Sequence, residues 1–214
     1  MDINYILNTV AQVFYYFFLI FTILIISSYI ILAFFSTRET SDYIKKNSFL
    51  QYKDLLSSDL APSISIIAPA YNESLNIIEN VRSLLSIHYV NFNVIIVNDG
   101  SKDDSLEKLI KAYSLEKVEY LLDEKIKTQP LRHGVFKSLN PAFDKLIVVD
   151  KENGGKADAL NVGINFSENK YIACIDVDCL LLKDSLQKMI KPFLEYTDTK
   201  VIASGGVIRI ANSC

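Results

Sequence analysis

Two carboxylates two positions apart, Asp176 and Asp178, interrupt an otherwise apolar stretch that reads YIACIDVDCLL. In an extended segment alternate side chains share a face, so these groups point the same way, about 6 to 7 Å apart. Their repulsion is roughly 2 to 3 kcal/mol at an effective dielectric near 20, and a hard divalent cation bound between them removes it. We therefore expect a Mg²⁺ or Mn²⁺ site. The alternative is that one carboxylate caps a helix near residue 183 and the other is solvated.

Three further polar groups follow short apolar runs. Residues 69–73 (PAYNE) form a turn, in which Tyr71 offers a flat ring and a hydroxyl to a base or a ribose. Asp99 lies in an Asn-Asp-Gly-Ser turn and can accept from an N–H such as that of a uracil imide. Lys156 follows two glycines at a helix start, where a phosphate would bind. The first two segments are also good turns without any ligand.

Alternating strand and helix patterns position these groups. The predicted strands are 63–68, 93–97, 118–122, 146–149, 171–175 and 201–204, and the predicted helices are 75–85, 105–113, 157–166 and 182–193. This order predicts an α/β fold with a mostly parallel sheet and flanking helices. Ligands of such sheets bind beyond the carboxyl ends of the strands, where all the polar groups above occur. Residues 123–145 are expected to be a solvated loop, which could instead contact lipid headgroups or a donor phosphate.

An apolar run precedes this domain and predicts one transmembrane helix. Residues 13–35 are almost wholly apolar and long enough to span a membrane. A secretory signal would need a basic start and a shorter apolar core. Positive charges follow at Arg38, Lys45, Lys46 and Lys53, which favours a single-pass protein of the cell membrane with a cytoplasmic catalytic domain. The predicted organisation is an anchor at 1–36, a juxtamembrane linker at 37–61 that contacts membrane lipid, and a domain at 62–214.

Charge and cysteine content exclude other classes. A net charge of −3 without a basic stripe argues against a nucleic-acid partner. Three cysteines, Cys174, Cys179 and Cys214, predict no disulfide scaffold, and Cys174 is expected in the core. Their spacing to His88 and His133 matches no zinc pattern.

Five motifs in order resemble the membrane-bound, processive-type family 2 glycosyltransferases, such as poly-N-acetylglucosamine, hyaluronan and cellulose synthases. The motifs are PAYNE at 69–73, VNDGS at 97–101, NGGKADALN at 153–161, DVD at 176–178 and ASGGVIRIAN at 203–212. The resemblance implies a GT-A fold, a UDP-sugar donor and inversion at the anomeric carbon. It also implies a polysaccharide or lipid-linked acceptor.

The resemblance also assigns roles to residues. Pro69, Tyr71 and Glu73 belong to the turn that would hold uridine, with Tyr71 at the base and Glu73 near the ribose. Asp99 would bind uracil, and Lys156 the diphosphate and donor sugar. Asp176 would lie against the ribose or sugar and contribute to the metal site, and Asp178 would ligate the metal.

The acceptor side of the reaction has no candidate residues in this sequence. In the family, a general base and a Gln-x-x-Arg-Trp motif follow the segment that matches, so the base is expected beyond Cys214. We therefore expect these 214 residues to bind donor weakly or not at all, and not to polymerise sugar alone. The alternatives are a non-catalytic membrane-tethered remnant, half of a split enzyme that pairs with a second chain, and a lipid-linked sugar transferase.

Overall fold

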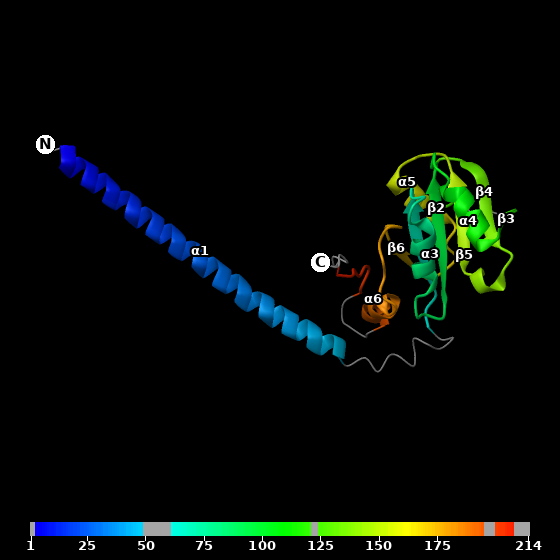
Figure 1. Ribbon diagram of the computed structural model, residues 1–214. Helices are drawn as coiled ribbons and strands as arrows, with labels where there is room; N and C mark the ends of the chain where they lie inside the picture. The colour runs from blue at the N-terminus through cyan, green and yellow to red at the C-terminus, as the bar shows by residue number, and fades with distance from the viewer. Residues whose placement is uncertain (1–2, 49–60, 121–123, 195–199, 208–214) are drawn as a thin grey trace. The chain divides into compact units, whose positions relative to one another are not determined.

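The computed structural model describes residues 3–48, 61–120, 124–194 and 200–207 (Figure 1). The chain divides into two units, Met1–Gln51 and Tyr52–Cys214. Linker residues 49–60 lie outside the described residues, as do positions 208–212 of the last family motif. The division into 1–36, 37–61 and 62–214 stays a prediction.

The first unit is one helix, α1, Ile3–Ser48, which continues past residue 36. Within it, Leu7–Ser41 is a candidate membrane span, and its most apolar 18-residue window has a mean hydropathy of 2.7. The hydroxyls of Thr22 and Ser27 donate to the carbonyls four residues earlier, at 2.8 and 2.7 Å. Because the helix satisfies these polar groups internally, they do not oppose insertion into lipid.

The second unit is built on a six-stranded mixed sheet in the order β3-β4-β5-β2-β1-β6 (Figure 1). The four parallel strands are β1 (Ile64–Ala70), β2 (Phe92–Asp99), β5 (Leu146–Lys151) and β6 (Tyr171–Cys174). At the far edge β3 (Leu115–Val118) and β4 (Leu131–Ser138) are added antiparallel. The α/β class with a largely parallel sheet is confirmed.

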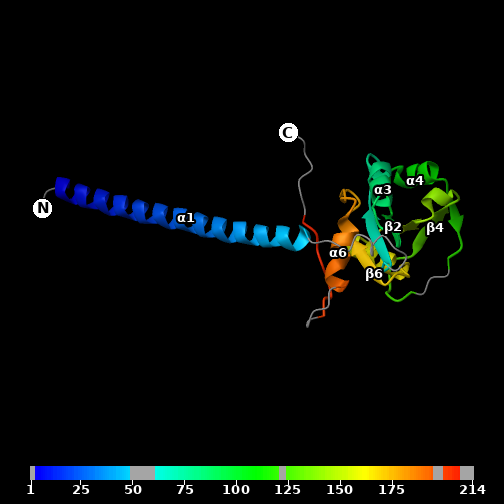
Figure 2. The same cartoon turned by 90° about the horizontal axis from the view of Figure 1, so that it is seen from below.

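Helices cover both faces of the sheet. The helices α3 (Ile77–Leu85), α4 (Ser105–Tyr113) and α6 (Ser185–Leu194) pack on one face, which includes Ile66 and Ile96 (Figure 2). The helix α5 (Lys156–Asn165) packs on the other face, against Ile67 and Ile95. Neighbouring strand residues thus enter opposite cores, which explains why β1, β2 and β5 are almost continuously apolar. A short 3-10 helix, η1 (Pro141–Phe143), precedes β5.

Three predictions for the sheet are wrong. The segment expected as a solvated loop contains β4, in which Val135 and Phe136 are both buried, one in each core. Only two adjacent apolar residues among charged ones give no alternating pattern, so the strand is hard to recognise from sequence. Residues 201–204, expected as a strand, lie within the described part of the chain and are not one. Strand β3 also ends at Val118, where the predicted strand 118–122 was to begin.

Cys174 is exposed, so the prediction that it belongs to the core is wrong. It lies on β6, the edge strand, and shares a face with Ile172, which is 45% exposed. Beside this strand is an open groove of about 880 Å³, with Lys170, Met189 and Ile202 in its lining. The predicted buried strand 171–175 is therefore a half-exposed edge.

The sheet brings the ends of its strands to one edge. Ala70 pairs with Asn98, Asn98 with Asp150, and Asp99 with Lys151. Because β4 runs antiparallel to β5, its first residues also lie at this edge: Leu131 pairs with Lys151. The ends of four strands therefore meet where the sequence places the candidate site.

We predict that Ile67→Ala lowers the free energy of unfolding by about 2 to 5 kcal/mol, because it leaves a cavity under α5. Ile67 is fully buried. The matched control, Ile172→Ala on the exposed face of β6, should cost less than about 1 kcal/mol. Urea unfolding of the full chain in detergent, followed by circular dichroism, measures both; equal losses would contradict the described core.

Candidate functional site

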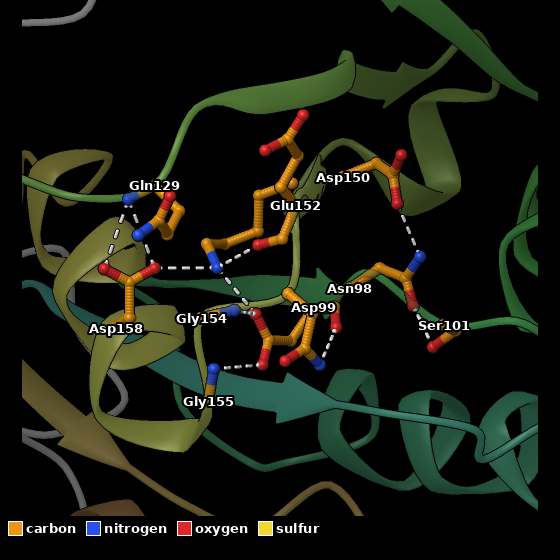
Figure 3. Close-up of polar contacts among 11 residues, drawn as sticks. Asn98, Asp99, Ser101, Gln129, Asp150, Glu152, Gly154, Gly155 and Asp158 are labelled. Atoms are coloured by element: carbon orange, nitrogen blue, oxygen red, sulfur yellow. Dashed lines mark hydrogen bonds and ion pairs between the residues drawn. The ribbon is translucent and has the colours of Figure 1, made fainter.

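Asp99 is buried at the end of β2 and forms hydrogen bonds with the glycine loop, residues 153–155, which precedes α5 (Figure 3). Its Oδ1 accepts hydrogen bonds from Lys151 Nζ at 2.6 Å and from the Gly154 amide at 2.9 Å. Its Oδ2 accepts from the Gly155 amide at 2.8 Å. The side chain expected to contact uracil therefore also fixes the loop that carries Lys156. Its contact with a base stays a prediction.

Lys151 is the buried cation of this cluster, with a side chain that is 0% exposed. Besides Asp99, its ammonium contacts Asp158 Oδ2 at 2.7 Å and donates to the Glu152 carbonyl at 2.5 Å. Asp158, in the first turn of α5, also accepts a hydrogen bond from the backbone N–H of Gln129 (Figure 3). Neither Lys151 nor Asp158 was among the predicted site residues. The signal of Lys151 in the sequence was a charge at the end of an apolar strand, which needs a buried partner.

A second polar network lies at the other face of the same edge. Asp150 is fully buried; its Oδ1 accepts from Asn98 Nδ2 at 2.5 Å, and its Oδ2 lies 2.5 Å from His133 Nδ1. The Ser101 hydroxyl donates to Asn98 Oδ1 at 2.5 Å and accepts from the Asn72 amide at 3.0 Å. These bonds join the ends of β4, β5 and β2 to the turn after β1.

The predicted uridine-binding residues are Pro69, near the end of β1, and Tyr71 and Glu73, in the turn after it. Asn72 adopts a left-handed backbone (φ 56°), and its side chain accepts from the Lys102 amide at 2.8 Å. This conformation is uncommon except for glycine and asparagine. The ring of Tyr71 is 45% exposed and free to meet a ligand.

Side chains at the start of α4 accept hydrogen bonds from the C-terminal part of this turn. The Glu73 amide donates to the Ser105 hydroxyl at 3.1 Å, and the Ser74 amide donates to Asp103 Oδ2 at 3.0 Å. Burial opposes the ionisation of Asp103, but hydrogen bonds from Ser105 and Ser74 outweigh it, so the pKa of Asp103 lies below its ordinary value. The turn is thus fixed before any ligand arrives.

The two carboxylates of the DVD segment follow β6 and are exposed. Oxygens of Asp176 and Asp178 and the sulfur of Cys179 lie within 4.8 Å of one another, a group that could hold a metal ion. The ammonium of Lys156 forms an ion pair with Asp176 Oδ1. The hydrogen bond to Asp176 and the charge of its carboxylate raise the pKa of Lys156. Burial, followed by the charges of Asp178 and Asp176, raises the pKa of the Cys179 thiol.

The structure thus brings several predicted residues together. Lys156, from the start of α5, meets Asp176, from beyond β6, and Asp178 lies beside Asp176. Strand β1, with its Pro69–Glu73 turn, lies between β2 and β6 in the sheet, and therefore between Asp99 and Asp176. His133, considered above as a zinc ligand, faces Asp150 instead.

Residues 65–145 and 132–212 match the model of glycosyl transferase family 2. The chain belongs to this family. Its mixed sheet with flanking helices is the α/β, GT-A-type arrangement expected for such a member.

Curated relatives and solved structures are similar to the chain over part of their length. The chain is 29% identical to poly-beta-1,6-N-acetyl-D-glucosamine synthase of Staphylococcus aureus (strain COL) over 84% of this chain and 35% of the synthase. It is 32% identical to an uncharacterized glycosyltransferase of Rickettsia bellii over 70% of this chain and 18% of that protein. The chain therefore spans about a third or less of the length of these relatives.

Two solved structures are also similar. Mannosyltransferase PcManGT from Pyrobaculum calidifontis, in complex with GDP-Man and Mn²⁺, has 21% identity and a TM-score of 0.47, over 64% of this chain and 35% of that one. S. aureus TarS 1-349 in complex with UDP-GlcNAc has 21% identity and a TM-score of 0.41, over 59% and 29%.

We predict that Gly100→Ala destabilises the domain more than Gly155→Ala. Both glycines have a positive φ, 67° at Gly100 and 84° at Gly155. A Cβ at Gly100 would lie 2.7 Å from the backbone nitrogen of Asn153, whereas a Cβ at Gly155 would have no neighbouring atom within 4 Å. Gly155→Ala should therefore cost about 1 to 3 kcal/mol for the backbone alone, because essentially only glycine adopts its φ and ψ of 84° and 168°. Gly100→Ala should cost more than that because it adds the clash with Asn153. Thermal unfolding of both variants decides; equal losses would mean that the two loops are not in close contact.

Proposed function

We propose that this chain carries the donor-binding and metal-binding part of an inverting UDP-sugar-dependent glycosyltransferase. The observation that carries the proposal is the meeting of Lys156 with the Asp176–Asp178 pair at the edge where the β1 turn and Asp99 also lie. A nucleoside diphosphate sugar offers a flat base, a diol and two phosphates. An aromatic ring, carboxylates and an ammonium are suited to these three groups.

The carboxylates are suited to a hard divalent cation. Asp176 and Asp178 present oxygen ligands side by side, as Mg²⁺ and Mn²⁺ require, with Asp178 as the principal ligand. When bound, the cation would act as a Lewis acid that stabilises the departing UDP. Lys156 would add positive charge where the leaving group gains negative charge. Its present bond to Asp176 keeps the ammonium close to that position.

The nucleoside would bind between the β1 turn and the glycine loop. Tyr71 would stack on the base, Glu73 would lie near the ribose, and Pro69 would keep the turn rigid. The backbone N–H groups of Asn72 and Ser74 donate to Ser101 and Asp103, which follow β2, and these hydrogen bonds preorganise the turn after β1. Preorganisation lowers the entropy lost on binding. None of the described residues is assigned as the catalytic base.

The product we propose is a β-linked polysaccharide made at the cytoplasmic membrane. The first relative is named for the synthesis of such a polymer from N-acetylglucosamine. Helix α1 would anchor the chain, with Arg38 after its apolar part favouring a cytoplasmic catalytic domain. A lipid-linked acceptor is the alternative, because residues that select the acceptor are not among those described above.

A non-catalytic role is the second candidate function. Strand β6 is at the sheet edge, and the groove beside it is lined by apolar side chains such as Ile172 and Ile190. Such an edge can pair with a strand of a second chain. A membrane-tethered module of this kind would bind its partner with or without UDP and Mn²⁺, which distinguishes it from the donor-binding role.

We predict that Mn²⁺ strengthens the binding of UDP to the full chain, and that Asp178→Ala removes this gain, a loss of about 10-fold or more in affinity. The reason is that a bridging cation lets a diphosphate approach two carboxylates. NMR titration of UDP in detergent micelles, with Mg²⁺ in place of paramagnetic Mn²⁺ where spectra require it, measures the affinity.

Asp184→Ala is the matched control for this experiment. Asp184 is also a half-exposed carboxylate and pairs with Lys188 at 2.8 Å, outside the acidic group. This variant should keep the gain from the cation. Identical behaviour of the wild type and Asp178→Ala would rule out the metal role of Asp178.

A further inference from the structure

Lys156 and Asp176 form an ion pair at the surface of the proposed donor site. Their side chains are 63% and 50% exposed, so a ligand from solvent can reach both. Oxygen atoms of Asp176 and Asp178 lie within 4.8 Å of each other. The hydrogen bond to Asp176, the charge of its carboxylate and then the charge of Asp178 raise the pKa of Lys156. The ammonium therefore interacts with both carboxylates of the proposed metal site.

The backbone is fixed on both sides of this ion pair. Lys156 is the first residue of α5 and follows the glycine loop, whose amides donate to Asp99. On the other side, Val177 is buried, and the Cys179 amide donates to the Asp176 carbonyl at 3.0 Å. The long, flexible side chain of Lys156 is therefore the part of this contact that can move when a ligand binds.

A divalent cation and the ammonium compete for the same carboxylate pair. Mg²⁺ and Mn²⁺ take carboxylate oxygens directly, and a second positive charge at the same group repels them. An ion pair between exposed side chains is weak, so the lysine gives way at a cost of no more than about 5-fold in metal affinity. A diphosphate offsets this cost, because its oxygens offer the ammonium a new partner in place of Asp176.

We propose that Lys156 is a placeholder for the divalent cation, which pairs with Asp176 until a diphosphate draws the ammonium away. Metal and nucleotide then strengthen each other's binding, because either one releases the lysine for the benefit of the other. The inference rests on the proposed function, since it takes Asp176 and Asp178 as metal ligands. It deepens that function by giving the lysine a second role, which is to make metal binding depend on the nucleotide.

The test measures Mn²⁺ binding by the full chain in detergent micelles, from the electron paramagnetic resonance signal of free Mn²⁺. Wild type and Lys156→Met are compared without UDP and with UDP at a concentration that saturates each protein. Without UDP, the variant should bind Mn²⁺ about 3- to 5-fold more tightly, because no ammonium has to be displaced. With UDP, the two affinities should agree within about 2-fold, because the wild-type ammonium then pairs with phosphate.

Two further variants are controls. Lys188→Met removes the same charge from another exposed ion pair, that of Lys188 with Asp184 at 2.8 Å, and should bind Mn²⁺ as the wild type does. Lys156→Arg keeps a cation that can pair with Asp176, and should also resemble the wild type without UDP. Because Lys156 is largely exposed, replacing it leaves both cores of the domain unchanged.

A simple repulsion between Lys156 and the metal predicts a different result. The variant would then bind Mn²⁺ more tightly than the wild type by the same factor with and without UDP. That outcome overturns the placeholder role, as do equal Mn²⁺ affinities of the two proteins without UDP. It is also overturned if UDP does not change the Mn²⁺ affinity of the wild type.

Asp178→Ala separates the failure of the proposed function from the failure of this inference. If neither the wild type nor Lys156→Met binds Mn²⁺, or if Asp178→Ala binds it as well as the wild type does, the metal site is wrong and the placeholder role falls with it. If Mn²⁺ binding requires Asp178 but does not respond to Lys156→Met, the metal site stands and only the placeholder role is overturned.

Discussion

A buried ammonium between two carboxylates stabilises the edge of the sheet at which the parallel strands end. Parallel strands and their helices bury apolar side chains along their length, but at the carboxyl ends the chain turns and backbone amides need partners. Asp99 satisfies two such amides in the glycine loop, and this requires a charged side chain inside the protein. Lys151 balances that charge and connects it to α5. The glycine loop and the start of α5 therefore depend on one cation.

Two separate networks serve the two faces of the same edge. Asp99 and Lys151 face α5, whereas Asn98 and Asp150, one position earlier on each strand, connect with Ser101 and the β1 turn. Because successive strand residues point to opposite faces, two adjacent polar residues on each of two neighbouring strands are enough to build both. This gives a physical reason for polar pairs at the ends of strands that are otherwise apolar.

The sequence predicts the parts of the fold that have a local pattern. The strands β1, β2 and β5 follow from apolar runs bounded by turns, and α4 from apolar spacing at the helical period. It fails for β4, where two buried residues lie among polar ones and the partner strands decide the conformation. It fails for the face of Cys174 because the position of β6 at the sheet edge is a tertiary property.

The same distinction applies to the site. Asp176 and Asp178 could be found as charges where apolar residues were expected, and Lys156 as a cation after two glycines at a helix start. The structure brings the three together. The partners of Lys151 could not be found in this way, because they lie 52 residues before it and seven after it in sequence. Only the register of β2 against β5 places Asp99 beside it.

The length of α1 has a consequence for how it can sit in a bilayer. The helix has 46 residues and is about 69 Å long, against a hydrocarbon layer of about 30 Å. Its apolar run, residues 13–35, is about 35 Å long and spans that layer with a tilt of about 30°, within the usual range of about 0 to 40°. The helical turns after residue 35, which carry Arg38 and Glu39, therefore continue beyond the hydrocarbon layer instead of ending at its surface.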